Sequence, residues 1–78
     1  MLAEAWSSYA AQVIPRDAPK VQRQESRRAF YAGARSLLDG IMASLDPDKE
    51  PTLDDYARMD AIQRELSTFA RDVERGNA

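Results

Sequence analysis

Basic side chains at helical spacing offer the clearest chemistry in this sequence. Six of the eleven basic residues lie between positions 16 and 35, and several recur at steps of three and four, which places them on one face of a helix. An arginine guanidinium grips a phosphate with two parallel hydrogen bonds, and the N-terminus of a helix also favours an anion. The pattern is typical of an anion-binding surface, which we call the basic face. The basic face comprises Arg16, Lys20, Arg23, Gln24, Arg27 and Tyr31.

Each part of this predicted site has an alternative role. Trp6 and Tyr9 precede the basic face, and their rings could stack on a nucleotide base or pack as core residues against the long helix. The cations could bind a phosphate or pair with carboxylates near the end of the chain. Those carboxylates are Glu65, Asp72 and Glu74.

Other residue types argue against catalysis. The chain has no histidine and no cysteine, so the usual general base, zinc ligands and disulfides are missing, and the serines have no histidine to activate them. No glycine-rich phosphate loop of a known type occurs. We therefore expect neither an enzyme nor a bound cofactor.

An acidic stretch after residue 45 suggests calcium only superficially. Asp46, Asp48 and Glu50 alternate as EF-hand ligands do, but that pattern needs a glycine and a glutamate where the chain has Pro51 and Ala57. We interpret this stretch as a solvated turn and predict no metal site.

Periodicity predicts an all-α fold in a single domain, residues 1–78, with helices at about 2–14, 19–45 and 52–75. Pro15 ends the first helix, and Pro19 suits the first position of the second. No strand pattern is present.

Local signals also mark the last helix. Thr52 and Asp55 form a shortened capping box at its start, and Gly76 suits its end. An apolar seam follows between them at steps of three and four. The seam comprises Tyr56, Met59, Ile62, Leu66, Phe69 and Val73.

The long helix carries more apolar surface than one neighbour covers. A broad arc of large side chains runs beside a strip of small ones that would admit a close helix neighbour or a flat ligand. We expect the long helix to form a long antiparallel hairpin with the last helix, and the first helix to cover part of it. We also expect this unit to assemble as a homo-oligomer. The arc comprises Phe30, Ala34, Leu37, Leu38, Ile41, Met42 and Leu45, and the strip Ala29, Gly33, Ser36, Gly40 and Ser44.

Charge and hydropathy limit the partners. The formal net charge is −2 over 78 residues, whereas general nucleic-acid binders carry a positive excess. No segment has the length and apolarity of a membrane span, and no basic segment precedes the first apolar residues as in an export signal. These features predict a cytoplasmic protein.

Three sequence runs carry a resemblance to small proteins encoded by phages and prophages of proteobacteria. They are P-x-x-A-P-x-x-Q-x-x-E-x-x-R-A-F-Y-A-G-A from Pro15, P-T-x-x-D from Pro51 and E-L-x-x-F-A from Glu65. The layout of a short lead-in, a long helix with a basic start, a polar turn and a last helix is also similar to the anti-CBASS and anti-Thoeris sponge proteins. Those proteins are helical oligomers that sequester cyclic oligonucleotide or ADP-ribose-derived immune signals. The last helix lacks the central tryptophan of the anti-CBASS pattern, so the resemblance does not identify the ligand.

The resemblance implies a non-enzymatic immune-evasion protein in the host cytoplasm that sequesters a phosphorylated nucleotide. Arg16, Lys20, Arg23 and Arg27 would contact phosphates, and Tyr31 a base or ribose. The alternative function is inhibition of a host defence or regulatory protein through the apolar arc and the acidic turn.

Overall fold

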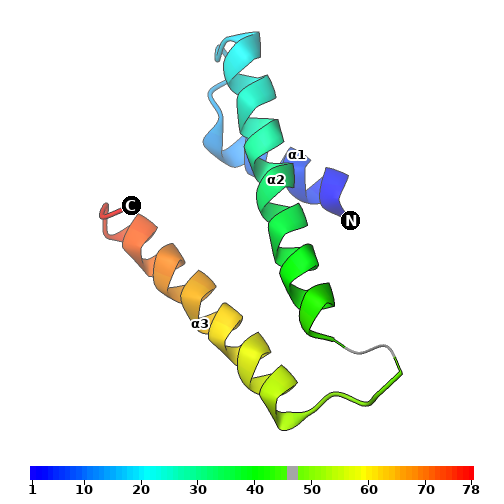
Figure 1. Ribbon diagram of the computed structural model, residues 1–78. Helices are drawn as coiled ribbons and strands as arrows, with labels where there is room; N and C mark the ends of the chain where they lie inside the picture. The colour runs from blue at the N-terminus through cyan, green and yellow to red at the C-terminus, as the bar shows by residue number, and fades with distance from the viewer. Residues whose placement is uncertain (46–47) are drawn as a thin grey trace. The chain divides into compact units, whose positions relative to one another are not determined.

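Three α-helices account for most of the chain in the computed structural model (Figure 1), which describes residues 1–45 and 48–78. They are α1 (Leu2–Val13), α2 (Lys20–Ser44) and α3 (Leu53–Glu74). These described residues contain no strand, so the predicted all-α class is confirmed. Asp46 and Pro47 of the predicted turn lie outside the described residues, while residues 48–50 are exposed and non-helical.

The chain divides into two compact units of opposite formal charge. The first unit, Met1–Asp39, has six basic and four acidic residues, a balance of +2. The second unit, Gly40–Ala78, has five basic and nine acidic residues, a balance of −4. The cations of the predicted site are therefore gathered in a unit of opposite charge to the chain as a whole.

Aromatic contacts join α1 to α2 within the first unit. The ring centroid of Phe30 lies 5.6 Å from that of Trp6 and 5.9 Å from that of Tyr9. Such separations are typical of aromatic pairs in protein cores. The prediction that the first helix covers part of the long helix is confirmed by these contacts.

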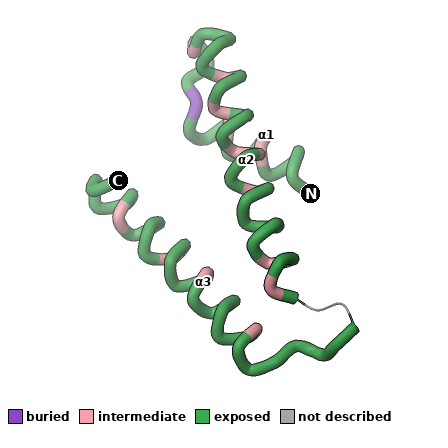
Figure 2. Tube along the Cα trace, viewed as in Figure 1, coloured by how far each residue is buried: buried purple, intermediate pink, exposed green. Residues whose placement is uncertain are grey.

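The end of α1 contains the most enclosed side chain. Ile14 is 8% exposed, and no other apolar side chain among the described residues is as fully buried (Figure 2). Its backbone is extended, as expected of a residue before a proline, while its N–H still donates to the Ala10 carbonyl at 3.1 Å. Helix α1 therefore ends at Val13, one residue before the predicted end at residue 14, and Ile14 is its C-terminal cap.

Helix α2 begins one residue later than predicted. The Pro19 carbonyl accepts a hydrogen bond from the Arg23 N–H at 3.2 Å, so Pro19 lies at the cap position and Lys20 is the first helical residue. A proline is tolerated here because an N–H at the start of a helix has no partner within it. The Ala18 N–H donates to the Pro15 carbonyl at 3.1 Å and closes a tight turn before the helix.

Helix α3 has both predicted end structures. Thr52 Oγ1 accepts from the Asp55 N–H at 3.2 Å, and the Thr52 N–H donates to the Asp55 carboxylate at 2.8 Å, which completes a capping box. At the other end, Gly76 has a φ of +75°, and the Asn77 N–H donates to the Asp72 carbonyl at 2.8 Å. This is a Schellman motif, and it requires the left-handed conformation that glycine adopts without strain.

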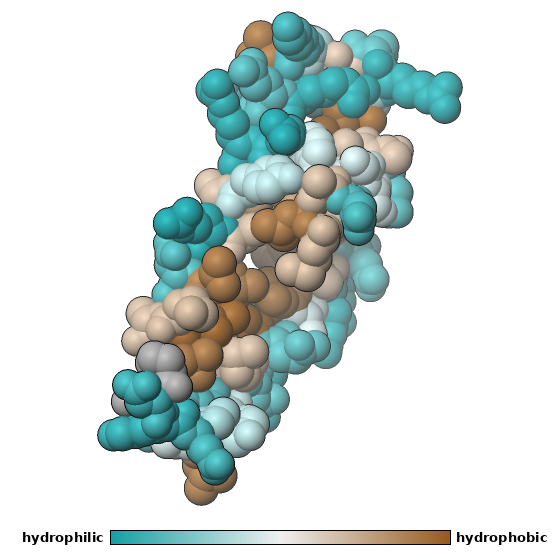
Figure 3. All heavy atoms as spheres, turned by 90° about the vertical axis from the view of Figure 1, so that its right-hand side faces the viewer, coloured by the Kyte–Doolittle hydropathy of each residue, from teal (hydrophilic) through white to brown (hydrophobic). Residues whose placement is uncertain are grey.

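Large apolar side chains are exposed in both units, and Figure 3 shows such side chains (brown) on the surface of one face. On α2, Leu38 is 55% and Met42 61% exposed, and on α3, Phe69 is 60% exposed. A Cβ built on Gly33 would meet nothing within 4 Å, so the small strip is open at this position. The predicted hairpin and oligomer would cover such surfaces.

We expect the Thr52→Ala variant to lose about 1 kcal/mol of stability, because the Asp55 N–H then loses its side-chain acceptor. For a domain of this size the melting temperature should fall by roughly 4–8 °C, as measured by circular dichroism. Thr68→Ala is the matched control, since Thr68 is exposed within α3. Equal melting temperatures for the two variants would show that the capping box does not contribute.

Candidate functional site

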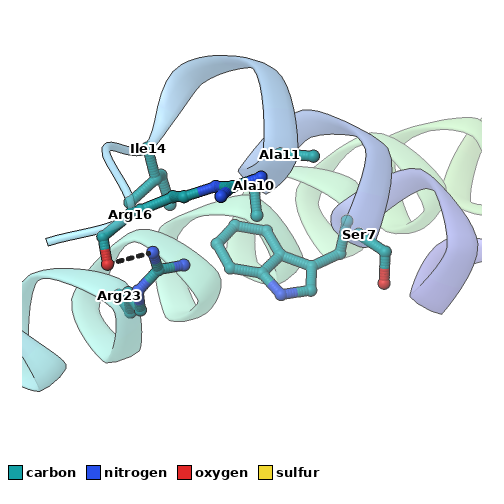
Figure 4. Close-up of a pocket in the computed structure, with 7 residues that line it drawn as sticks. Ser7, Ala10, Ala11, Ile14, Arg16 and Arg23 are labelled. Atoms are coloured by element: carbon teal, nitrogen blue, oxygen red, sulfur yellow. Dashed lines mark hydrogen bonds between the residues drawn. The ribbon is translucent and has the colours of Figure 1, made fainter. Parts of the chain in front are cut away.

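Arg23 holds the turn between α1 and α2. Its Nη2 donates to the backbone carbonyl of Pro15 at 2.8 Å and to that of Arg16 at 3.2 Å, and Figure 4 shows the bond to Arg16. The side chain is half-buried, although arginine is usually exposed. Arg23 therefore has a structural role that the sequence did not indicate, and its remaining nitrogens make no hydrogen bond among the described residues.

The aromatic residues form a connected cluster rather than separate platforms. Besides the contacts of Phe30 with α1, the Trp6 and Tyr9 centroids are 6.0 Å apart and the Phe30 and Tyr31 centroids 5.7 Å apart. Trp6, Phe30 and Tyr31 are half-buried, while Tyr9 is 43% exposed. Trp6 and Tyr9 therefore both pack against Phe30, and each keeps part of its surface exposed.

Tyr31 also contacts a cation of the basic face. The guanidinium carbon of Arg27 lies 5.3 Å from the centroid of the Tyr31 ring, within the range of a cation–π interaction. This contact orients the Arg27 side chain while its N–H groups remain available. A base could stack on this face of the ring only if Arg27 moved aside.

Three open depressions lie along the first unit. One of about 490 Å³ is lined by Gln24, Arg27, Arg28 and Tyr31, all on α2. A second, of about 330 Å³, lies where α2 meets α1. It is lined by Trp6, Ala10, Lys20, Arg23, Gln24 and Arg27.

The third depression, of about 410 Å³, lies beside the turn after α1. Figure 4 shows Arg16 and Arg23 at one side of it and Ser7 on α1 at the other. The third and second depressions share the lining residues Trp6 and Arg23. The second and first share Gln24 and Arg27. Neighbouring depressions thus share lining side chains, and we call the three together the basic groove.

The cations of the basic groove are poorly compensated within their own unit. In residues 1–39, all of which the structure describes, ion pairs join the N-terminus to Glu4, Arg28 to Glu25 and Arg35 to Asp39. None involves Arg16, Lys20, Arg23 or Arg27. Because these four lie close together on one turn and one helix face, an anion bound among them would relieve their mutual repulsion.

The structure brings together seven of the eight predicted site residues. Every member of the basic face lines the groove, and so does Trp6, whereas Tyr9 lines none of the three depressions. Sequence reasoning missed Arg28, which follows Gln24 by four residues and precedes Tyr31 by three. That spacing was the available signal, because residues three and four apart share a helix face.

The basic groove is rich in hydrogen-bond donors. Its polar groups are guanidinium, ammonium, amide and hydroxyl donors, which suit phosphate oxygens. In residues 1–45 and 48–78, no cluster of three or more aspartate, glutamate, histidine or cysteine side chains is placed to bind a metal. None of the helices in these residues has the length and apolarity needed to cross a bilayer.

Comparisons of the chain with protein-family models, with curated proteins and with solved structures gave no match.

We expect the Arg23→Ala variant to lose about 2 kcal/mol of stability, because two carbonyl groups lose their charged donor. The fluorescence of Trp6, the single tryptophan, should shift to longer wavelength as α1 loosens from α2. Arg35→Ala is the matched control, because Arg35 forms an exposed pair with Asp39 on the same helix, worth only a few tenths of a kcal/mol. An unchanged Trp6 spectrum in Arg23→Ala would contradict the proposed structural role.

Proposed function

We propose that this chain is a non-enzymatic binding protein that sequesters a phosphorylated nucleotide in the basic groove. The observation that carries the proposal is the gathering of Arg16, Lys20, Arg23 and Arg27 without a carboxylate partner in their own unit. Guanidinium and ammonium groups supply the donors that phosphate oxygens accept. The indole edge of Trp6 and the amide of Gln24 lie in the same depression and would contact the nucleoside.

The resemblance to phage-encoded sponge proteins agrees with this chemistry. A sponge must bind its ligand and leave it intact, so it needs cations and aromatic surface but no nucleophile or general base. In this proposal the protein acts in the host cytoplasm, binds a cyclic or ADP-ribose-derived signal, and keeps it from the effector that the signal activates.

A second candidate is an inhibitor that binds a host protein, and the charge and exposure of the second unit favour it. That unit has a formal charge of −4, and the apolar side chains of Tyr56, Leu66 and Phe69 on α3 are more than half exposed. Acidic residues around an apolar row suit a basic surface on a protein partner. In that case substitutions at Glu50 and Asp54 abolish function, and substitutions at Arg27 are tolerated.

Both candidates are compatible with an antiparallel hairpin of α2 and α3 that assembles as a homo-oligomer. The apolar arc of α2 and the seam of α3 run over several turns each and would bury one another. The proposal adds a second copy because the small strip and the broad arc together exceed what one helix neighbour covers.

A thermal-shift screen with cyclic di- and trinucleotides, linear nucleotides and ADP-ribose derivatives tests the sponge proposal. A ligand at 100 times its Kd adds about 2.7 kcal/mol of stability, which for this chain length is a rise of roughly 10–20 °C in melting temperature. The ligand should be recovered unchanged.

The same screen should be run on two variants. Arg27→Gln should lose most of the shift, because Arg27 lines two of the three depressions. Arg35→Gln should retain the shift, since Arg35 lies on α2 but lines none of these depressions. A flat screen, followed by capture of a host protein that depends on Glu50 and Asp54, would favour the inhibitor instead.

Light scattering tests the assembly. We expect at least a dimer at high micromolar concentration, because the exposed apolar side chains of α2 and α3 favour association. Leu38→Glu and Met42→Glu should shift the population toward the monomer, whereas Gln22→Glu, at a polar exposed position of α2, should not. A stable monomer of the unmodified chain under these conditions would contradict the prediction.

A further inference from the structure

The length of the basic groove limits what a single phosphate can contact. Along α2, the groove extends from Lys20 to Tyr31, which is about 16 Å at 1.5 Å per residue. Arg16 lies at the turn beyond the N-terminal end of this segment. A charge-assisted hydrogen bond spans only about 3 Å, so one phosphate could engage all the cations of the groove only if their side chains converged on one point.

The cations occur along the whole groove rather than at one point. Arg16 lines the depression at the turn, Lys20 the middle depression and Arg28 the depression farthest along α2, where Arg28 also forms an exposed ion pair with Glu25. Arg23 and Arg27 line the boundaries between adjacent depressions. A ligand that neutralises this series must carry several anionic groups in a row.

Neutral planar side chains lie between these cations. Trp6 lines the depression at the turn and the middle depression with Arg23, and Gln24 lines the middle depression and the one farthest along α2 with Arg27. Aromatic rings and amides alternating with cations suit a chain in which bases alternate with phosphates. An acidic peptide has no ring at regular spacing to use these positions.

We infer that the basic groove takes a short linear oligonucleotide, with successive phosphates on successive cations from Arg16 to Arg28. At the 3.4 Å rise of a stacked strand, 16 Å accommodates about five phosphates, and fewer in an extended strand. This inference rests on the proposed binding of a phosphorylated nucleotide in the same groove, and it takes a linear, multiply phosphorylated ligand in place of the cyclic or ADP-ribose-derived signal.

The test is a length series of 5′-phosphorylated oligothymidylates, from one to eight nucleotides, titrated into the full chain by calorimetry at several salt concentrations. We expect the affinity to rise about tenfold with each added nucleotide up to three to five, and then to level off. The slope of log K against log salt should steepen from about −0.7 for one phosphate contact to about −2 for three.

Variants at the two ends of the groove sharpen the test. Arg16 and Arg28 are exposed, and each of the variants Arg16→Gln and Arg28→Gln should lower the affinity for a tetranucleotide about tenfold. At most one of the two variants should lower the affinity for the mononucleotide. Arg35→Gln is the control, because Arg35 lies on α2 outside the groove and should change neither. Circular dichroism checks that each variant is folded.

Three results would overturn the inference. Equal affinities for the mononucleotide and the tetranucleotide would show that the site has a single phosphate subsite, and the proposed function would still hold. A tetraglutamate peptide that binds as tightly as the tetranucleotide would make the groove a general polyanion site. Absence of binding by every nucleotide, cyclic or linear, would remove the proposed function together with this inference.

Discussion

The arrangement of the first unit depends on the bonds from the Arg23 guanidinium to the carbonyl groups of Pro15 and Arg16. The connection between α1 and α2 contains two prolines, which have no N–H to donate, so it can form few hydrogen bonds of its own. A half-buried arginine from the first turn of α2 supplies the missing donors. These bonds hold the turn from which α1 crosses α2 (Figure 1), and α1 carries the Trp6 ring that contacts Phe30.

The same interaction has an electrostatic consequence. Carbonyl dipoles orient a guanidinium but do not neutralise it, whereas a carboxylate does both. Arg28 and Arg35 have carboxylate partners on their own helix, but Arg23 has carbonyl partners and keeps its full charge beside Lys20 and Arg27. A structural contact thus leaves a concentrated positive charge at the meeting of two helices, which is the physical basis for proposing an anionic ligand there.

The small core gives ligands and partners a large influence on stability. Ile14 is the one buried apolar side chain in residues 1–45 and 48–78, and large side chains such as Leu38 and Phe69 are exposed. A chain of this length buries little surface by itself, so its net stability is a few kcal/mol. Anything that binds the folded state alone raises that stability by mass action. Binding of a nucleotide and self-association would both act on the fold in this way.

The sequence by itself determined the helices and their ends, because those signals are local. Pro15 ends α1, the Thr52 capping box starts α3 and Gly76 ends it, each through contacts within a few residues. Helical spacing also placed the members of the basic face from Lys20 to Tyr31 on one side of α2. Only the tertiary structure decided that Arg23 binds the turn and that Trp6 packs against Phe30. Those contacts depend on the path of α1 across α2. That path is set by side chains many residues apart in the sequence, so no local pattern predicts it.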